Sequence, residues 1–325
     1  MKAIVIEQSG SPKVLKIKNV SLPESKAGWA LIRIRAFGIN RSEIFTRQGH
    51  SPDVIFPRIL GIEAVGEVVD DPSGTYQIGQ KVAAVMGGMG RQYDGGYAEF
   101  ALLPVKRLLP LSTNLSWDVL GALPEMFLTV WSSLTESLEV QAGQSLLVRG
   151  GTSSIGLTTI SVAKRQGLTV LATTRNDSKR QKLIEAGADH IIIDDGVIAA
   201  KVRDIMPNGV DRVQELVGTK TLFDSLQATA PKGVVCMTGI LGNEWSIADF
   251  QPFIHVPSSV KLTTYQSETL NITTAKHALQ EYVTDVEQGT HKVHIDRVFK
   301  FEEIVEAHHY MESNQAKGKL VVLVD

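Results

Sequence analysis

The spacing of hydrophobic and polar residues changes near residue 117 of this 325-residue chain. Before that point, short stretches of alternating apolar and polar positions are separated by glycine-rich turns, as in residues 30–39, 61–71 and 81–88. Alternation of this kind, with turn signals at this spacing, is typical of β-strands. The first part of the chain is therefore predicted to be a largely β domain.

After residue 117, apolar strands alternate with segments whose apolar residues recur at helical spacing. Strands are predicted at 145–151, 168–174, 190–194, 210–217, 233–240 and 260–266, with a helix after the first and helices at 178–188, 196–206 and 220–230. Such an alternation implies a parallel sheet covered on both faces. Two further helices, at about 272–288 and 302–314, and a strand at 319–325 are predicted to follow.

The first turn of this series almost matches the dinucleotide fingerprint G-x-G-x-x-G. Gly151 and Gly156 occupy its outer positions, and Ser153 stands at the middle one. A turn into a helix N-terminus offers free N–H groups and the positive end of the helix dipole, which suit a pyrophosphate. The Ser153 hydroxyl either donates to a phosphate oxygen or caps the helix. Because the turn follows the first strand of the series, we predict dinucleotide binding.

Composition narrows the function classes. A net charge of −2 and a pI near 6.5 indicate neither a nucleic-acid nor a membrane-surface partner. No apolar run approaches the roughly 18 residues of a membrane span, and the N-terminus lacks the pattern of a secretory signal. Cys236 is the only cysteine, which excludes disulfides within the chain and metal sites of several cysteines. We expect a cytoplasmic protein.

Several segments together resemble the zinc-free quinone oxidoreductase (ζ-crystallin-like) branch of the medium-chain dehydrogenase/reductase superfamily. They are residues 36–49, 57–69, 79–85, 94–100, 121–134, 146–156 and 306–324. The resemblance implies an α/β fold in which a Rossmann domain with a doubly wound parallel sheet is inserted into a GroES-like, β-rich catalytic domain. The expected boundaries are 1–119, 120–265 and 266–325, and the family places nicotinamide and substrate in a cleft between the domains.

Departures from the zinc-dependent relatives define the expected active site. Those relatives carry Cys where this chain has Asn40 and His where it has Ile62, so the resemblance implies a zinc-independent enzyme. Asn40 matches the family's active-site asparagine and is predicted to donate its amide to a carbonyl; the alternative is a turn residue that opens a helix. Glu43 and Arg47 share a helical face with Asn40, and we expect them to form an ion pair. Phe45 stands where many relatives carry tyrosine.

The eight histidines offer no replacement metal site. His291 and His294 flank a strand-like stretch, and the neighbouring His308 and His309 point in different directions on a helix. We expect these histidines to be solvated or to cap helices.

The resemblance also implies a set of cofactor contacts. Thr129 matches a threonine near the nicotinamide and is expected, with Asn40, at the catalytic centre. The ends of the fourth and fifth Rossmann strands would border adenosine and nicotinamide, or form ordinary turns. Lys319 matches the family's closing Gly-Lys, with a solvated charge as the alternative. The expected cofactor-binding residues are Gly151, Thr152, Ser153, Ser154, Ile155, Gly156, Thr174, Arg175, Lys179, Val217, Gly218, Thr238, Gly239 and Lys319.

The end of the second Rossmann strand predicts NADPH rather than NADH. NAD-dependent folds place Asp or Glu about 20 residues past the fingerprint, where it binds the ribose hydroxyls. Here the residue 19 positions beyond Gly156 is Arg175, followed by Lys179 and Arg180. These cations suit a 2′-phosphate, although Asp177 partly offsets their charge.

The resemblance therefore implies an NADPH-dependent reductase of a quinone or an α,β-unsaturated carbonyl. Without zinc no Lewis acid stabilises an alkoxide, whereas a conjugated acceptor needs only one or two hydrogen bonds to its oxygen. A 2-enoyl thioester reductase and a non-catalytic, crystallin-like NADPH-binding protein are the alternatives. A homodimer is expected through the edge strand at 258–266, whose alternating residues suit pairing with its own copy.

Overall fold

The computed structural model describes all residues, 1–325, and the chain folds into two compact units. Residues 1–128 and 267–325 form the β-rich unit, and residues 129–266 form the Rossmann unit. The first division lies beyond the expected boundary after residue 119. It falls there because the helix α2 (Trp117–Leu120) packs on strands of the β-rich unit, so that the unit continues into α3 (Pro124–Ser132).

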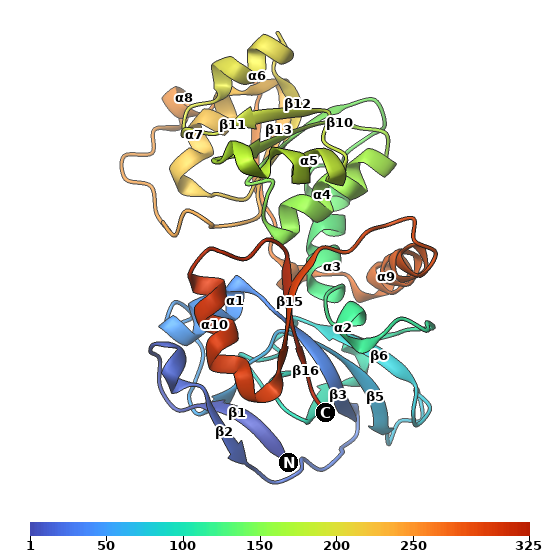
Figure 1. Cartoon of the computed structure of the whole chain (residues 1–325). Coiled ribbons are helices and arrows are strands. Elements are labelled where there is room, and N and C mark those ends of the chain that lie inside the picture. The colour runs from blue at the N-terminus through green and yellow to red at the C-terminus, as the bar shows by residue number, and fades with distance from the viewer. The chain divides into compact units, whose positions relative to one another are not determined.

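The Rossmann unit contains one all-parallel sheet of six strands with helices on both of its faces (Figure 1). Its strands are β9 (Ser145–Arg149), β10 (Thr169–Thr174), β11 (His190–Ile193), β12 (Val210–Glu215), β13 (Thr229–Met237) and β14 (Lys261–Thr264). Its helices are α4 (Ser154–Arg165), α5 (Arg180–Ala186), α6 (Ala199–Ile205), α7 (Thr219–Gln227) and α8 (Pro252–His255). The strand order is β11-β10-β9-β12-β13-β14, which is the doubly wound order of dinucleotide-binding domains.

This order puts β9 at the centre of the sheet and β14 at its edge. Strands β10 and β11 lie on one side of β9, and strands β12 to β14 lie on the other. In such sheets, ligands bind outside the carboxyl ends of the strands at the point where the order reverses. The predicted series of strands and helices is thus confirmed, and α8 is a short helix that the sequence pattern did not predict.

The β-rich unit is built from two sheets. A three-stranded sheet has the order β2-β1-β4, and a seven-stranded sheet has the order β15-β16-β3-β5-β6-β8, with β7 also paired to β3. The strands are β1 (Lys2–Ile6), β2 (Lys16–Asn19), β3 (Trp29–Ile39), β4 (Arg58–Ile59), β5 (Glu63–Asp70), β6 (Lys81–Val85), β7 (Phe100–Pro104), β8 (Leu108–Pro110), β15 (Ile295–Lys300) and β16 (Lys319–Leu323). The remaining helices are α1 (Arg41–Gln48), α9 (Ile272–Glu287) and α10 (Ile304–Glu312).

The last strand of the chain completes this unit. β16 pairs antiparallel with β3, with Leu320 opposite Ile39 and Val321 opposite Gly38. Extending this register by one residue places Lys319 beside Asn40, although 279 residues separate them in the sequence. Both ends of the chain therefore build one site.

The expectation for the histidines is wrong at His308. Its side chain is fully buried, and its Nε2 lies 3.1 Å from the hydroxyl oxygen of Tyr97. Burial lowers the pKa of His308 to about 3, so the imidazole is neutral at physiological pH. His291 is buried as well.

No group of three or more His, Cys, Asp or Glu side chains is arranged to hold a metal ion. No helix combines the length and apolar character that a membrane span requires.

Candidate functional site

The glycine-rich turn between β9 and α4 is shaped by close backbone packing. Gly150 has a φ of +89°, which favours glycine. A Cβ on Gly156 would lie 2.6 Å from the carbonyl oxygen of Gly150, so the first turn of α4 rests directly on the loop. The carbonyl oxygen of Thr173, on β10, accepts a hydrogen bond from Gly151 N, and its hydroxyl accepts one from Gly150 N. Together these contacts fix the turn.

The side chain of Ser153 is the N-cap of α4. Its Oγ accepts a hydrogen bond from Gly156 N at 3.0 Å and donates to the carbonyl oxygen of Gly150 at 2.9 Å. The sequence left open whether Ser153 donates to a phosphate or caps the helix, and in the structure it caps the helix. The N–H groups of Ser154 and Ile155, at the first two helical positions, have no acceptor within the helix, an arrangement that suits an anion.

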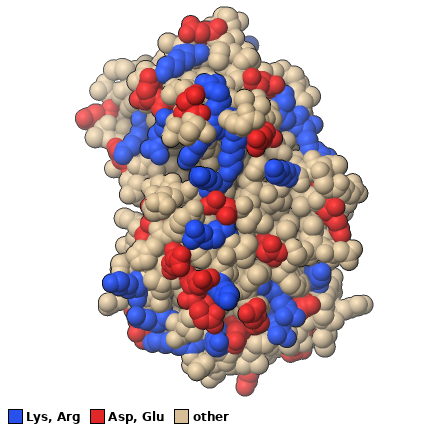
Figure 2. Space-filling view, viewed as in Figure 1, with Lys and Arg blue, Asp and Glu red and all other residues tan.

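The end of β10 carries the predicted phosphate-reading cations. Arg175 is exposed, and Asp177 is engaged by Arg180 through a 2.8 Å ion pair rather than by Arg175 or Lys179. Figure 2 shows Lys and Arg side chains gathered over the part of the Rossmann unit where α4 and α5 lie. The buried Thr174 shapes the same turn, since its hydroxyl donates to the carbonyl oxygen of Asn176.

The carboxyl ends of β12 and β13 meet backbone to backbone. Gly218 has a φ of +98°, and a Cβ there would lie 2.9 Å from the carbonyl oxygen of Gly239. Glu215, a residue that the sequence pattern did not single out, accepts hydrogen bonds from Val217 N at 2.7 Å and Gly218 N at 3.0 Å. Thr238 N donates to the carbonyl oxygen of Glu215 at 2.9 Å. The two predicted strand ends are therefore held as one rigid edge.

Arg149 lies beneath this edge and was also missed. Its guanidinium is fully buried and forms a bidentate pair with Asp194, at 2.9 and 3.0 Å, and a 2.7 Å pair with Asp224. Nη1 also approaches the hydroxyl of Ser225, which in turn donates to Glu215 Oε2 at 2.5 Å. Burial raises the pKa of Glu215, while these hydrogen bonds oppose the shift.

A second buried network surrounds Asn40 in the β-rich unit. Lys319 Nζ lies 2.6 Å from Glu63 Oε1 and 2.5 Å from Asn40 Oδ1. Asn40 Nδ2 donates to Glu63 Oε1 at 2.9 Å, with a longer contact of 3.5 Å to Glu43 Oε1. Lys319 is 2% exposed and Glu63 1%, so the expected alternative of a solvated Lys319 is wrong. Asn40 itself is only half-buried.

The expected ion pair between Glu43 and Arg47 does not form. Arg47 pairs instead with Glu312 on α10 and donates to the carbonyl oxygen of Gly10. Glu43 accepts hydrogen bonds from the backbone N–H groups of Asn40 and Ile62, at 3.1 and 3.0 Å. Burial raises the pKa of Glu43 to about 7, with a further contribution from the nearby Glu63 carboxylate.

Two further predicted positions belong to helices. Thr129 is buried in α3. Phe45 is half-buried in α1, where its ring centroid lies 6.3 Å from that of His50.

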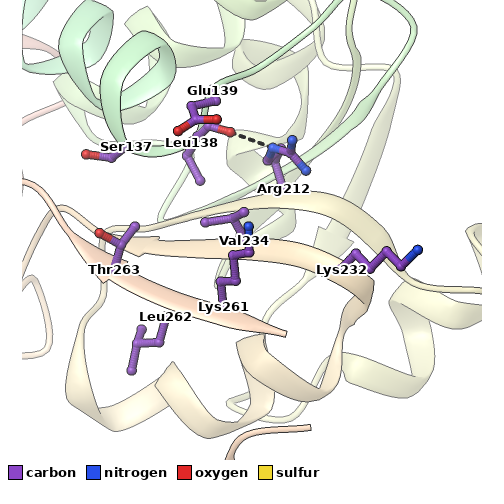
Figure 3. A pocket seen from close by; sticks show the side chains of 9 residues that line it. All are labelled: Ser137, Leu138, Glu139, Arg212, Lys232, Val234, Lys261, Leu262 and Thr263. Carbon is purple, nitrogen blue, oxygen red and sulfur yellow. Dashed lines mark hydrogen bonds between the residues drawn. The ribbon is translucent and has the colours of Figure 1, made fainter. Parts of the chain in front are cut away.

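A cavity of about 490 Å³ also opens in the Rossmann unit, along β14 and the amino-terminal halves of β12 and β13 (Figure 3). Arg212, Lys232 and Lys261 line it, and Arg212 Nε donates to the carbonyl oxygen of Leu138 at 2.5 Å. The carboxyl ends of the strands, where the phosphate turn lies, are at the other end of the sheet. This cavity is therefore not part of the predicted cofactor edge.

Comparisons with known proteins agree with this architecture. The alcohol dehydrogenase GroES-like domain family matches residues 26–113, and the zinc-binding dehydrogenase family matches residues 186–322. The quinone oxidoreductase of Mus musculus is 27% identical over all of this chain and 98% of its own length. The structure of the Coxiella burnetii quinone oxidoreductase has a TM-score of 0.85 at 25% identity and covers 100% of this chain and 99% of its own.

The structure of the Escherichia coli quinone oxidoreductase, solved in complex with NADPH, has a TM-score of 0.91 and covers all of both chains. At 20% identity this likeness concerns the fold alone. The fold class predicted from the sequence is confirmed, with a GroES-like domain and a Rossmann domain. These matches confirm the resemblance of the chain to the quinone oxidoreductase branch of the medium-chain dehydrogenase/reductase superfamily.

Proposed function

We propose that this protein is an NADPH-dependent reductase that delivers a hydride to a quinone or an α,β-unsaturated carbonyl without zinc. The observation that carries the proposal is Asn40, a half-buried amide held among buried charges where zinc-dependent relatives carry a cysteine thiolate. An amide of this kind can donate to a carbonyl oxygen but cannot ligate zinc as a thiolate does.

The Rossmann unit supplies groups suited to NADPH. The N–H groups of Ser154 and Ile155 would bind the pyrophosphate, and Arg175 with Lys179 would bind the 2′-phosphate. Gly218 and Gly239 lack side chains at the strand ends that border adenosine and nicotinamide in this fold. When bound, NADPH supplies the hydride. The E. coli relative that shares this fold was solved in complex with NADPH.

The acceptor class follows from the groups around Asn40. Hydride addition to a conjugated carbonyl compound places negative charge on an oxygen, and a hydrogen bond from Asn40 Nδ2 would stabilise that charge. Phe45 has no hydroxyl, so in this proposal the proton that completes the reaction comes from solvent. The quinone oxidoreductases among the relatives support a quinone acceptor.

A panel of acceptors tests the proposal directly. NADPH oxidation is followed with 1,4-benzoquinone, naphthoquinones, 2-alkenals and a crotonyl thioester. Turnover of quinones or alkenals is expected, while turnover of the thioester alone would identify a 2-enoyl thioester reductase. Tight NADPH binding without turnover of any acceptor would support the crystallin-like alternative and contradict the proposal.

Zinc independence has its own test. One family that matches the chain is described as zinc-binding, whereas Asn40 and Ile62 replace the Cys and His of zinc-dependent relatives. Metal analysis of purified protein should find no stoichiometric zinc, and chelators should leave activity and melting temperature unchanged. Equimolar, tightly held zinc would contradict the proposal.

A homodimer through the edge of the Rossmann sheet is part of the same proposal. The segment before β14 exposes several large apolar side chains: Trp245, Phe250, Phe253 and Ile254, with Leu262 on the strand itself. Exposed apolar residues and an unpaired strand edge are each typical of an association surface. Light scattering at micromolar concentration should give twice the monomer mass of 35.4 kDa, and a monomer would contradict this part.

A further inference from the structure

Lys319 is a donor without any acceptor capacity, and the structure gives it two acceptors. Its side chain is 2% exposed, and its ammonium lies 2.6 Å from Glu63 Oε1 and 2.5 Å from Asn40 Oδ1. An ammonium group accepts no hydrogen bond, so only the oxygen of the Asn40 amide can face it. The positive charge of Lys319 therefore determines which end of the Asn40 amide is Oδ1 and which is Nδ2.

Glu63 fixes the other end of the same amide. Its Oε1 accepts from Asn40 Nδ2 at 2.9 Å, and its Oε2 accepts from Glu125 N at 2.9 Å. β3 approaches the pair so closely that a Cβ on Gly38 would lie 2.2 Å from Glu63 Oε1 and 2.4 Å from Lys319 Cε. The glycine leaves the space that the buried pair occupies.

The arrangement leaves Asn40 one amide hydrogen. Nδ2 carries two hydrogens, and one of them is taken by Glu63. The second meets only the 3.5 Å contact to Glu43, which is at the limit of a hydrogen bond. Asn40 is half-buried while Lys319, Glu63 and Glu43 are buried, so among these side chains only that of Asn40 is partly open to a ligand.

We propose that Lys319 and Glu63 are positioning residues that hold the Asn40 amide with its nitrogen toward the acceptor carbonyl. This inference rests on the proposed function, since it assigns a role to residues around Asn40 in that reaction. It also assigns Lys319 a role different from the cofactor contact expected from the sequence: its ammonium is used within the Asn40 network.

The variant that tests the proposal removes both charges at once. Lys319→Met with Glu63→Gln removes both members of the buried ion pair, and neutral replacement of such a pair is often tolerated. The control is Lys2→Met with Glu302→Gln, at an exposed pair of the same unit. Melting temperature confirms that both double variants fold, and Lys319→Met alone is made for comparison.

The first readout is the side-chain amide of Asn40 by NMR, in protein labelled with ¹⁵N only at its eight asparagines. The Asn40 signals are those lost in Asn40→Ser. In the wild type, one amide hydrogen should exchange slowly and the other quickly, and in the Lys319/Glu63 variant both should exchange as in free asparagine. Unchanged Asn40 signals in the folded variant would overturn the proposal, and they would do so whether or not any acceptor is turned over.

The second readout compares kcat with the KM for NADPH. The Lys319/Glu63 variant should lose about 10- to 100-fold in kcat at saturating acceptor with the KM for NADPH unchanged, because a donor directed at developing charge is no longer held in place. The Lys2/Glu302 control should keep both values. A variant with altered Asn40 signals and full kcat would overturn the positioning role. If the wild type turns over no acceptor, the proposed function fails, and the NMR result still decides whether Lys319 and Glu63 hold Asn40.

Discussion

Each unit of the chain buries a network of charged side chains, one around Arg149 and one around Lys319. In the Rossmann unit, Arg149 directs its N–H groups to two carboxylates, a hydroxyl and the carbonyl oxygens of Thr221 and Gly196. In the β-rich unit, Lys319 and Glu63 hold a half-buried partner, Asn40, whose second amide hydrogen has only a long 3.5 Å contact, to Glu43.

This difference in pairing indicates which network stabilises the fold and which can contact a ligand. A buried network whose donors are all paired stabilises one arrangement of loops and offers nothing to a ligand. A network with one weakly paired donor on a half-buried side chain can present that donor in a fixed direction. The Arg149 network is therefore expected to stabilise the ends of β12 and β13, and the Lys319 network to act on the acceptor in the proposed function.

The largest expected effect is on the paired network. Arg149→Met should lower the free energy of unfolding by about 3–5 kcal/mol, because Asp194 and Asp224 would remain buried without their cation. Denaturant unfolding measures the loss. Arg149→Lys should recover part of it, since lysine keeps the charge but has three donors against five.

The control for Arg149 is Lys164→Met. The pair between Lys164 and Asp189 is about a third exposed, at 35% and 34%, so solvent screens it and the loss should be far smaller. Equal losses for Lys164→Met and Arg149→Met would contradict the assignment of stability to the Arg149 network.

The network around Lys319 and Asn40 includes the carboxyl group of Glu43, whose titration can be followed. The pKa of Glu43 is about 7 in the folded protein against 4.5 as the ordinary value, so the folded state binds the proton more tightly. Its contribution to stability is therefore full below pH 4.5 and is lost as pH rises through 7, by about 3 kcal/mol. Glu43→Gln should remove this loss, which urea unfolding at pH 5 and pH 8 measures.

The contribution of His308 to stability changes with pH in the opposite direction, and His308 is present in both the wild type and Glu43→Gln. Its pKa falls from 6.5 to about 3 on folding, so its contribution is present above pH 6.5 and is lost as pH falls through 3. Comparison of wild type with Glu43→Gln cancels this contribution. An identical pH dependence of the two proteins would show that Glu43 does not titrate in this range.

How far the sequence predicts these features depends on the distance between partners in the chain. The strands and helices of the Rossmann unit follow local periodicity, and the turn between β9 and α4 follows its glycines, so these elements were predicted. The networks join residues far apart: Lys319 and Glu63 are separated by 256 positions, and Arg149 and Asp224 by 75. No local spacing reveals such pairs.

The helix α1 shows why local spacing can also mislead. Glu43 and Arg47 have the i,i+4 separation of a helical ion pair, which in isolated helices contributes only about 0.2–0.5 kcal/mol. Tertiary partners outcompete so weak a preference. Arg47 is buried against Glu312, and Glu43 turns to two backbone N–H groups.

The next effect concerns an unpaired cation of the Rossmann unit. Arg175→Ala should weaken NADPH binding roughly 10- to 100-fold and leave NADH binding nearly unchanged, because a charge-assisted contact to the 2′-phosphate contributes about 1.5–3 kcal/mol. Arg180→Ala is the control, since Arg180 already pairs with Asp177. Fluorescence titration with both cofactors measures the ratio. Equal losses for NADPH and NADH would show that Arg175 does not read the phosphate.

The smallest expected effect decides the role of Ser153 in the phosphate turn. Its hydroxyl is used twice within the protein, by Gly156 N and the Gly150 carbonyl oxygen, so it has no hydrogen left for a phosphate. Ser153→Ala should lower the free energy of unfolding by about 1 kcal/mol, whereas Ser153→Gly, which restores the glycine of the fingerprint, should cost only a few tenths. If the hydroxyl serves only as a cap, NADPH affinity should fall little in either variant once measured where both are fully folded. A loss of NADPH affinity of 10-fold or more in both variants, with stability unchanged, would mean that the hydroxyl turns from the cap to the phosphate when the cofactor binds.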